Sequence, residues 1–226
     1  MSRVSAILLA AGKGLRFKSK ISKPLVKVNS QPVINYSLRV LSSCPGIKEI
    51  IVVANDSNLK ALSDKIEMLG IKKSVKIVRG GKRRQDSVLN GILAVDDRAD
   101  TVLIHDSARP FITPEIVASV LKEANKTGSA IVGVPVKATI KEVKGYFVKG
   151  TLKRDSLWEI QTPQVFKKSL ILKAYKKFAN IGVTDDASLV EKCGNKVKLV
   201  MGSYFNIKIT TPEDLVLAEA IAKEYN

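Results

Sequence analysis

Short runs of β-branched and apolar residues recur along the chain, and each run is followed by a stretch in which apolar residues have helical spacing. The runs are VSAILLA, EIIVVAN, VKIVRGG, TVLIHD and SAIVGVPV. Strands that alternate with helices form βαβ units, and runs without polar alternation are typical of parallel strands covered on both faces. The sequence therefore predicts an α/β fold, a Rossmann-like three-layer sandwich around a mostly parallel, twisted sheet.

The length of the chain fits one such unit, because 226 residues can bury a full core as a single α/β domain. We therefore expect one domain over residues 1–226. Helix starts are marked by Thr113-Pro114-Glu115, with a cap residue and a proline in the first turn. A second start is Thr211-Pro212-Glu213-Asp214, which resembles a capping box.

The alternation of strands and helices is interrupted once, between Lys137 and Leu157. There the sequence TIKEVKGYFVKGTLKRDS alternates, carries Gly145 and Gly150, and has no helical stripe. It predicts a β-hairpin arm that leaves the main sheet. A hairpin with so little apolar sequence is not stable alone, so we expect it to pack against a second copy of the chain in a two-fold dimer.

The chain is basic, with 38 Lys and Arg against 21 Asp and Glu and a formal net charge of +17. Such an excess indicates an anionic partner. The lysines are scattered, and neither a basic run interleaved with aromatics nor a zinc-finger or RNP-type pattern is present. We therefore expect no specific binding of nucleic acid, and a solvated basic surface is the simpler interpretation of many of the lysines.

The cysteine content, the length of the apolar segments and the N-terminal sequence indicate the cellular compartment. Cys44 and Cys193 are the only cysteines and no CxxC occurs, which argues against a disulfide framework and a zinc site and fits a reducing cytoplasm. No segment approaches the ~18 apolar residues of a membrane span. The N-terminal MSRVSAILLAAG runs directly into a glycine motif and predicts a first strand, not a signal peptide.

Polar motifs follow the predicted strands at their carboxyl ends. They are AAGKGLR at residues 10–16, GGKRRQDS at 80–87, HDSARP at 105–110 and PVKAT at 135–139. Ligands of open α/β sheets bind in the crevice beyond these ends, so we expect the four motifs to converge on one site.

The loop at residues 10–16 fits neither standard phosphate loop. It lacks the GxxxxGK[ST] pattern, and Phe17 stands where the dinucleotide fingerprint needs a third glycine. Its backbone N–H groups can still face an anion, with Arg16 and Lys23-Pro24 close behind. A tight turn with solvated lysines is the alternative interpretation of the two glycines alone.

Asp106 ends an apolar strand, where a carboxylate is costly unless it is paired or binds a metal. Mg²⁺ is a suitable partner, because it takes one or two protein carboxylates and completes its shell with water and phosphates. An Asp106–Arg109 ion pair is the structural alternative. His105, the only histidine, lies inside the strand pattern and is best interpreted as a packed core residue.

A chain with one histidine has no Ser-His-Asp or Cys-His set, so catalysis by a side-chain nucleophile is improbable. A phosphate monoester needs little proton transfer to act as a nucleophile, because its second pKa is about 6. Lys208, in the alternating NIKIT segment, points either to solvent or into such a site. Asp185 and Asp186 are interpreted first as residues of a helix N-terminus and less readily as metal ligands.

Seven segments, taken in order, resemble the 2-C-methyl-D-erythritol 4-phosphate cytidylyltransferase family. They are LLAAGKGLRF with Lys23, GGKRRQDSV, HDSARPF, VPVKATIKEV, LWEIQTPQVF, TDDASLVE and NIKITTPEDL. The resemblance implies a single nucleotidyltransferase domain that joins CTP and methylerythritol 4-phosphate, releases pyrophosphate and uses Mg²⁺.

The resemblance also implies roles for individual residues. The expected catalytic residues are Arg16, Lys23, Arg154 and Lys208. The expected nucleotide-binding residues are Ala10, Ala11, Gly12, Gly14, Gly81, Arg84, Ser87, Asp106 and Ser107. The expected substrate-binding residues are Arg109, Thr139, Thr162 and Thr184. Asp106 would lie by the metal, which the CTP phosphates mainly hold, while Arg154 and Thr162 would come from the arm of a second subunit.

Two positions depart from the pattern of the family. Lys82 stands where an acid is usual, which puts a carboxylate role there in doubt, and Pro24 follows Lys23 where glutamine is common. A related cytidylyltransferase that acts on ribitol 5-phosphate is the close alternative function. A basic nucleic-acid-binding protein is the alternative from another class.

Overall fold

A central seven-stranded sheet organises the molecule. In the computed structural model, which describes residues 3–12, 17, 21–178 and 180–224, the strand order is β11-β7-β10-β6-β1-β4-β5. Its strands are β1 (Val4–Leu9), β4 (Ile47–Ala54), β5 (Ser74–Arg79), β6 (Thr101–Asp106), β7 (Ser129–Pro135), β10 (Trp158–Lys167) and β11 (Lys198–Met201). β10 runs antiparallel to its neighbours β6 and β7, and the other neighbouring pairs are parallel. The mostly parallel sheet predicted from the sequence is confirmed.

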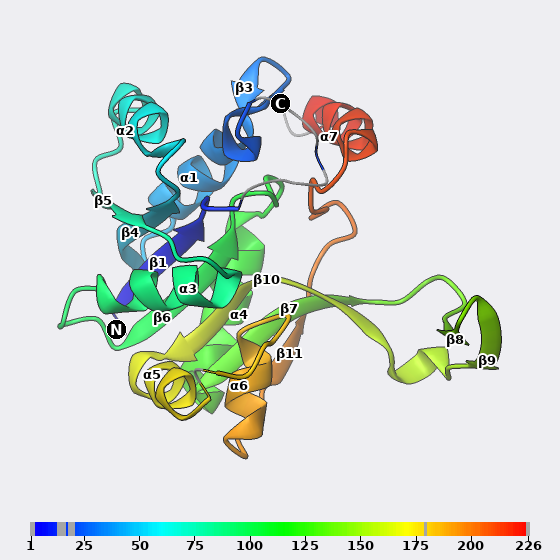
Figure 1. The fold of residues 1–226 in the computed structure, drawn as a ribbon. Coiled ribbons are helices and arrows are strands. Elements are labelled where there is room, and N and C mark those ends of the chain that lie inside the picture. The colour runs from blue at the N-terminus through cyan, green and yellow to red at the C-terminus, as the bar shows by residue number, and fades with distance from the viewer. Residues whose placement is uncertain (1–2, 13–16, 18–20, 179, 225–226) are drawn as a thin grey trace.

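Helices cover both faces of this sheet. They are α1 (Val33–Ser43), α2 (Leu59–Met68), α3 (Arg84–Leu93), α4 (Pro114–Thr127), α5 (Lys168–Lys177), α6 (Ala187–Lys192) and α7 (Glu213–Glu224), with short 3-10 turns η2 (Lys23–Leu25) and η3 (Arg154–Ser156). α1, α2 and α4 pack on one face and α3, α5 and α6 on the other, which gives the predicted three layers (Figure 1). Among the described residues, no helix has the length and apolar character needed to cross a membrane.

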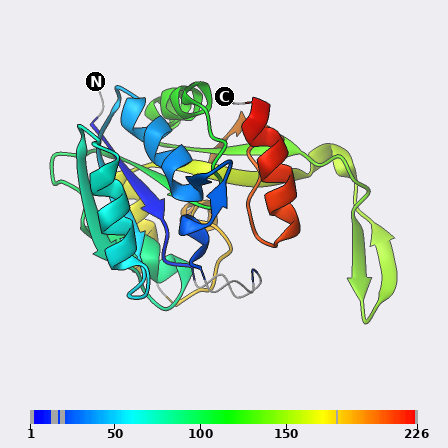
Figure 2. The same ribbon diagram turned by 90° about the horizontal axis from the view of Figure 1, so that it is seen from above.

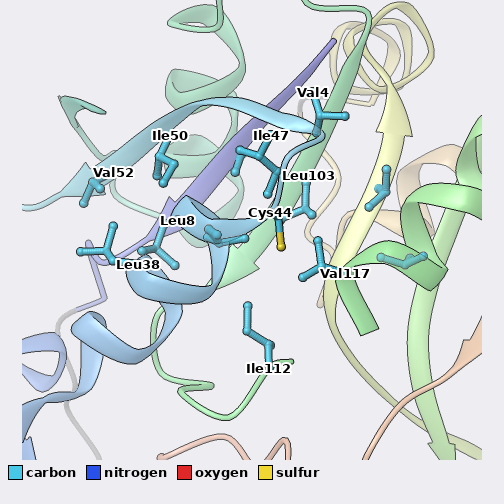
Figure 3. Close-up of a cluster of buried hydrophobic side chains, with 14 of the residues drawn as sticks. Val4, Leu8, Leu38, Cys44, Ile47, Ile50, Val52, Leu103, Ile112 and Val117 are labelled. Carbon is cyan, nitrogen blue, oxygen red and sulfur yellow. The ribbon is translucent and has the colours of Figure 1, made fainter. Parts of the chain in front are cut away.

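Alternate residues of the buried strands feed two separate cores. In β1, Ala6 and Leu8 face the cluster under α1, α2 and α4, whereas Ile7 faces the cluster under α3, α5 and α6. Figure 3 shows part of the first cluster, in which Leu8 of β1 and Leu38 of α1 lie beside Ile50 and Val52 of β4. Both faces of β1 are therefore apolar, because side chains of a strand alternate between two covered faces.

The boundaries of α4 follow its local sequence. Thr113 precedes the helix and its Oγ1 accepts a hydrogen bond from the N–H of Ile116 at 3.4 Å, with Pro114 as the first helical residue. The helix ends at Gly128, whose φ of 86° is a left-handed conformation that glycine adopts without a steric penalty. The helix start predicted at Thr113-Pro114 is confirmed.

A third, smaller cluster attaches α7 to the segment around β2 (Lys27–Val28) and β3 (Gln31–Pro32). Val28, Phe111, Ile209 and Ala218 are buried together in it. Asp214 Oδ2 accepts the backbone N–H of Thr211 at 2.8 Å, so the predicted capping arrangement at the start of α7 is present.

The predicted arm is also present. β8 (Lys141–Lys144) and β9 (Phe147–Thr151) form a two-stranded antiparallel hairpin that extends away from the body of the molecule (Figures 1 and 2). Its base is closed by a hydrogen bond from Val136 N to Leu157 O at 3.0 Å. Near that base, the guanidinium of Arg154 donates to the carbonyl of Lys137 at 2.7 Å.

Candidate active site

The carboxyl ends of the parallel strands converge at one edge of the sheet. Backbone N–H groups at three of these ends donate to the neighbouring strand: Ala10 to Val53 O at 2.8 Å, Gly80 to Ala54 O at 2.7 Å and Ser107 to Leu9 O at 3.0 Å. A Cβ on Gly80 would lie 2.5 Å from the Cβ of Ala11, so only glycine allows the two loops to approach this closely. Residues 10–12 and the motifs at 80–87 and 105–110 are therefore neighbours in space.

The residues expected to bind a nucleotide occupy this edge, and several hydroxyl hydrogens there are already used. The Ser107 hydroxyl donates to Leu9 O at 2.7 Å and the Ser87 hydroxyl to Arg83 O at 3.1 Å. Ser87 Oγ in turn accepts the N–H of Gly81 at 3.0 Å, which fixes the glycine pair against α3. Gly14 and Arg16, also expected at this site, lie outside the described residues.

Next to this edge lies a polar cleft of about 390 Å³ between β10, β6 and the loop before α6. It brings together six residues that the sequence predicted for the site: Arg84, Asp106, Arg109, Thr162, Thr184 and Lys208. These residues come from positions spread over more than half of the chain, so the cleft is produced by the convergence of strand ends.

Asp106 is the charged centre of the cleft. One carboxylate oxygen lies 3.3 Å from Nε of Arg84, and the other lies 2.5 Å from Nζ of Lys208. Burial opposes ionisation of Asp106, but the positive charges of Arg84 and Lys208 outweigh it and hold the pKa of this carboxyl well below its usual range. Asp106 is therefore ionised at neutral pH and fixes two cations at the cleft.

Arg84 is also held from a second side, by Asp186, for which the sequence predicted another role, and through it by Tyr175, which the sequence did not single out. Its Nη2 lies 2.9 Å from Oδ2 of the fully buried Asp186, whose Oδ1 accepts the hydroxyl of Tyr175 at 2.5 Å. Burial disfavours the charge of Arg84, yet Asp106 and Asp186 together raise its pKa. Asp186 immediately precedes α6, as predicted, but its side chain makes no capping bond and pairs with Arg84 instead.

Arg109 is 6% exposed and is fixed by main-chain oxygens. Its two terminal nitrogens donate to Asn206 O at 2.7 Å and Ile160 O at 3.3 Å, and its pKa is lowered by burial. Within the described part of the chain, its Nε has no hydrogen-bond partner. The Asp106–Arg109 ion pair considered from the sequence is not formed among the described residues, because Asp106 pairs with the two other cations. Arg109 is therefore anchored by the main chain at the lining of the cleft.

His105 is the packed core histidine that the sequence predicted. Its side chain is fully buried, with Nε2 at 3.0 Å from the carbonyl of Arg109 and Nδ1 at 2.9 Å from Thr162 Oγ1. Complete burial lowers the pKa of His105 to about 4, so the ring is neutral at neutral pH.

The expected origin of Thr162 in a partner's arm is wrong. Thr162 lies in β10, outside the arm, and lines the cleft of its own chain, where its Oγ1 accepts the N–H of Asp106 at 3.1 Å. The motif at residues 157–166 begins at the end of the arm and continues along β10 into the sheet, so the position that the resemblance implied for Thr162 does not apply to this chain.

The other expected residues lie outside the lining of this cleft. Thr139 and Arg154 belong to the exposed arm region. Lys23 lies in η2, where Nζ donates to Thr210 O at 3.3 Å and lies 5.5 Å from the centre of the Phe17 ring. The contact with Thr210 joins Lys23 to the irregular segment that carries Lys208.

A larger cleft of about 920 Å³ lies at the opposite edge of the sheet, around Asp100, Thr101 and Lys168. It is lined by the starts of β6 and α5, not by the carboxyl ends of parallel strands. Volume alone does not identify a site, and the smaller cleft has the convergent charged groups that a binding site requires.

The donor set at Asp106 suits a metal that arrives with a ligand. Among the described residues, no group of three or more His, Cys, Asp or Glu side chains could hold a metal ion. Both carboxylate oxygens of Asp106 already contact cations. Mg²⁺ often keeps several waters and binds through substrate phosphates with only one or two carboxylates, so these residues fit an ion carried mainly by a nucleotide.

Comparisons with known proteins agree with this geometry. The sequence model of the family described as IspD, 2-C-methyl-D-erythritol 4-phosphate cytidylyltransferase, matches residues 4–224. Proteins of that name are 46% identical in Caldanaerobacter subterraneus, over 98% of this chain and 99% of the relative, and 44% identical in Clostridium botulinum strain 657, over 99% of both.

Solved structures of the same kind share the fold. The 4-diphosphocytidyl-2C-methyl-D-erythritol synthase of Anaerococcus prevotii superposes with a TM-score of 0.87 at 34% identity, over 98% of this chain and 99% of that one. The 2-C-methyl-D-erythritol 4-phosphate cytidylyltransferase of Thermus thermophilus gives 0.80 at 30% identity, with the same coverage. The chain therefore belongs to the 2-C-methyl-D-erythritol 4-phosphate cytidylyltransferase family.

Proposed function

We propose that this protein transfers the cytidylyl group of CTP to 2-C-methyl-D-erythritol 4-phosphate and releases pyrophosphate, a step of isoprenoid precursor synthesis. The names of its relatives support this substrate pair. The observation that carries the proposal is the buried Asp106, which holds Arg84 and Lys208 at the edge of the sheet where the glycine loops meet. Two phosphorylated anions need such fixed cations to approach each other.

The chemistry needs positioning more than proton transfer. A phosphate oxygen of the polyol phosphate attacks the α-phosphorus of CTP, a new P–O bond forms, and the bond to the leaving pyrophosphate breaks. The nucleophile is already ionised at neutral pH, so no side-chain base is required. This agrees with the state of His105, which is neutral, fully buried and engaged on both ring nitrogens.

We assign the roles of individual residues on the same basis. Arg109 and Lys208 bind the polyol phosphate, since both cationic side chains line the cleft and Lys208 is partly exposed. Lys23 and Arg16 stabilise negative charge that develops on the α-phosphate. Ala10, Ala11, Gly12 and Gly14 bind the triphosphate, and Gly81, Arg84 and Ser87 bind the cytidine.

Mg²⁺ is the cofactor of this proposal. When bound to the CTP phosphates it neutralises charge on them, and Asp106 is the carboxylate of the cleft that would lie beside it.

A homodimer formed through the arm completes the site. The arm exposes apolar side chains in a single chain, and Arg154 and Thr139 of each subunit would reach the site of the other. Cys44 and Cys193 are free, which suits the reducing cytoplasm where we place the reaction.

The decisive experiment measures pyrophosphate release with each of the four nucleoside triphosphates and with two polyol phosphates. We expect turnover with CTP, methylerythritol 4-phosphate and Mg²⁺, and much slower turnover with ribitol 5-phosphate. Equal rates with all four nucleotides, or a preference for ribitol 5-phosphate, would contradict the proposal. Nucleic acid at matched charge concentration serves as a competitor, which should not inhibit at physiological salt.

A further inference from the structure

His105 lies behind the cleft and contacts two of the residues that line it. Nε2 is 3.0 Å from the backbone carbonyl of Arg109, and Nδ1 is 2.9 Å from Oγ1 of Thr162. The side chain is fully buried, and within the described part of the chain these two oxygens are its hydrogen-bond partners.

The first of these contacts decides which nitrogen carries the proton. A backbone carbonyl can only accept a hydrogen bond, so Nε2 must be protonated to bond to Arg109 O. In a neutral imidazole the other nitrogen is then an acceptor. The hydrogen between Nδ1 and Oγ1 therefore belongs to Thr162, whose hydroxyl donates to His105.

The second contact of Thr162 uses another part of its hydroxyl. The N–H of Asp106 donates to Oγ1 at 3.1 Å. A hydroxyl offers one donor and two acceptor lone pairs, so the donor and one lone pair of Thr162 are occupied. What remains is a single acceptor on a residue that lines the cleft.

We infer that His105 is a positioning residue that makes Thr162 a hydrogen-bond acceptor in the cleft, and that Thr162 thereby recognises a hydroxyl group of the polyol and not an oxygen of its phosphate. The inference rests on the proposed function. A dianionic phosphate has only acceptors and would meet an oxygen lone pair, whereas a sugar hydroxyl can donate to it. The phosphate has better partners in Arg109 and Lys208, which are cationic.

This division of roles bears on substrate choice. A site built to hydrogen-bond a substrate hydroxyl rejects analogues that lack it, because a polar group is then left unpaired. A phosphate contact at Thr162 would not distinguish one polyol phosphate from another. His105 would thus contribute to discrimination among polyols without touching the substrate.

The first test is nuclear magnetic resonance of the protein labelled with ¹⁵N-histidine. The chain has one histidine, so the spectrum contains a single imidazole and needs no assignment. We expect Nε2 to be protonated, and Nδ1 to show the shift of an unprotonated, hydrogen-bond-accepting nitrogen across the neutral pH range. A proton on Nδ1, in either the other tautomer or the imidazolium, would overturn the inference.

The second test pairs Thr162 variants with substrate analogues that each lack one hydroxyl of methylerythritol 4-phosphate. Thr162→Val removes the acceptor, and Thr162→Ser is the matched variant that keeps it. We expect Thr162→Val to lower kcat/KM for the full substrate roughly tenfold, mainly through KM, the scale of one hydrogen bond. With one of the analogues the difference between the Val and Ser variants should disappear, as a double-mutant cycle requires for two groups in contact.

The outcomes separate the inference from the proposed function. A Val-to-Ser difference of the same size for the full substrate and every analogue would place Thr162 on the phosphate or in a purely structural role, and would overturn the inference. Failure of the unaltered enzyme to turn over methylerythritol 4-phosphate would instead contradict the proposed function. The tautomer is measured on the free protein, so that result is independent of turnover.

Discussion

The cleft and the arm differ in how far their side chains are buried and paired within a single chain. In the cleft, Asp106, Arg84 and Asp186 are linked by ion pairs and mostly buried. In the arm, Tyr146 and Phe147 are 102% and 81% exposed, respectively, on a two-stranded hairpin. Two strands alone are marginal in water, and large apolar side chains in solvent indicate a missing partner surface. The cleft is therefore organised within one chain, whereas the apolar side chains of the arm remain exposed in it, as the proposed dimer requires.

The sharpest way to test this comparison is to place one defect in the body of one subunit and another in the arm of its partner. Lys23→Ala and Arg154→Ala should each lower kcat about a hundredfold or more, the scale of deleting a preorganised charge donor. When the two homodimers exchange subunits, about half of the dimers become mixed, and each has one site with both residues intact. We expect activity to recover to roughly a quarter of wild type, measured by pyrophosphate release.

Subunit exchange itself needs a control, which differently tagged subunits and co-purification provide. A mixture of two preparations of the same mutant should stay inactive after exchange. If exchange occurs and activity remains at the level of the separate mutants, Arg154 does not act on the neighbouring site.

A fall in pH should lower the free energy of unfolding through His105, which is buried beside the cleft. The pKa of His105 is lowered to about 4 by burial, while an unfolded histidine has a pKa of about 6.5. Between these values the unfolded chain binds the extra proton, so stability falls as the pH drops. We expect the free energy of unfolding to decrease by roughly 2.5 kcal/mol between pH 7 and pH 4.5 from this group, by urea titration.

Titration of the single imidazole provides the internal check on that loss. An imidazole that titrates near 6.5 in the folded protein, or a free energy of unfolding that is constant over this interval, would contradict the prediction. Asp106 adds a further loss at lower pH, because its pKa is held low by Arg84 and Lys208 against the effect of burial.

Loss of apolar area from the arm should weaken the association of two subunits and should leave the folding stability of each chain nearly unchanged. Phe147→Ala removes a side chain that is largely exposed in one chain, so the stability of the monomer should change little. Partial burial of one phenylalanine contributes about 1 kcal/mol, and a two-fold dimer loses this contribution twice, so the dimer Kd should rise about thirtyfold in sedimentation equilibrium. Met68→Ala on α2 is the matched control, at 76% exposure away from the arm, and should leave the dimer intact. An unchanged Kd for Phe147→Ala would show that the arm is not the interface.

The smallest expected effect concerns Asp186, the second carboxylate that pairs with Arg84. Tyr175→Phe removes only the hydroxyl that donates to Asp186 at 2.5 Å. Asp186 then holds Arg84 less firmly, and we expect kcat/KM for CTP to fall roughly fivefold, the scale of one hydrogen bond. Tyr36→Phe deletes a comparable hydroxyl, bonded to Val28 O at 2.8 Å, and should not change kinetics. Equal kinetics for both variants would show that Tyr175 is only structural.

The same contrast explains what the sequence could predict. The alternation of apolar runs predicted the parallel sheet, because covered strands need apolar residues on both faces. The arm between Lys137 and Leu157 was predicted because its alternation and glycines differ from the helical spacing around it. Convergence of strand ends predicted that Arg84 and Asp106 lie at one site, and the family resemblance added Lys208; the cleft brings the three side chains together.

What the sequence could not predict depends on packing between elements. Tyr175 reads as one apolar position of a helix, and nothing in its neighbourhood indicates a bond to Asp186 across the gap to α6. Asp186 reads as a cap residue, yet Arg84 takes its carboxylate. The resemblance placed Thr162 in the arm of a partner, whereas β10 carries it into the sheet of its own chain.

The closed base of the arm has a consequence for how its length can vary. Because Val136 and Leu157 are joined by a backbone hydrogen bond of 3.0 Å, the arm is an excursion whose two ends are already neighbours. Doubling the length of such an excursion costs only about 0.6 kcal/mol of loop-closure entropy. The reach of the arm is therefore almost independent of the stability of the body, and insertions or deletions near Gly145 should alter the subunit spacing of the proposed dimer long before they affect folding.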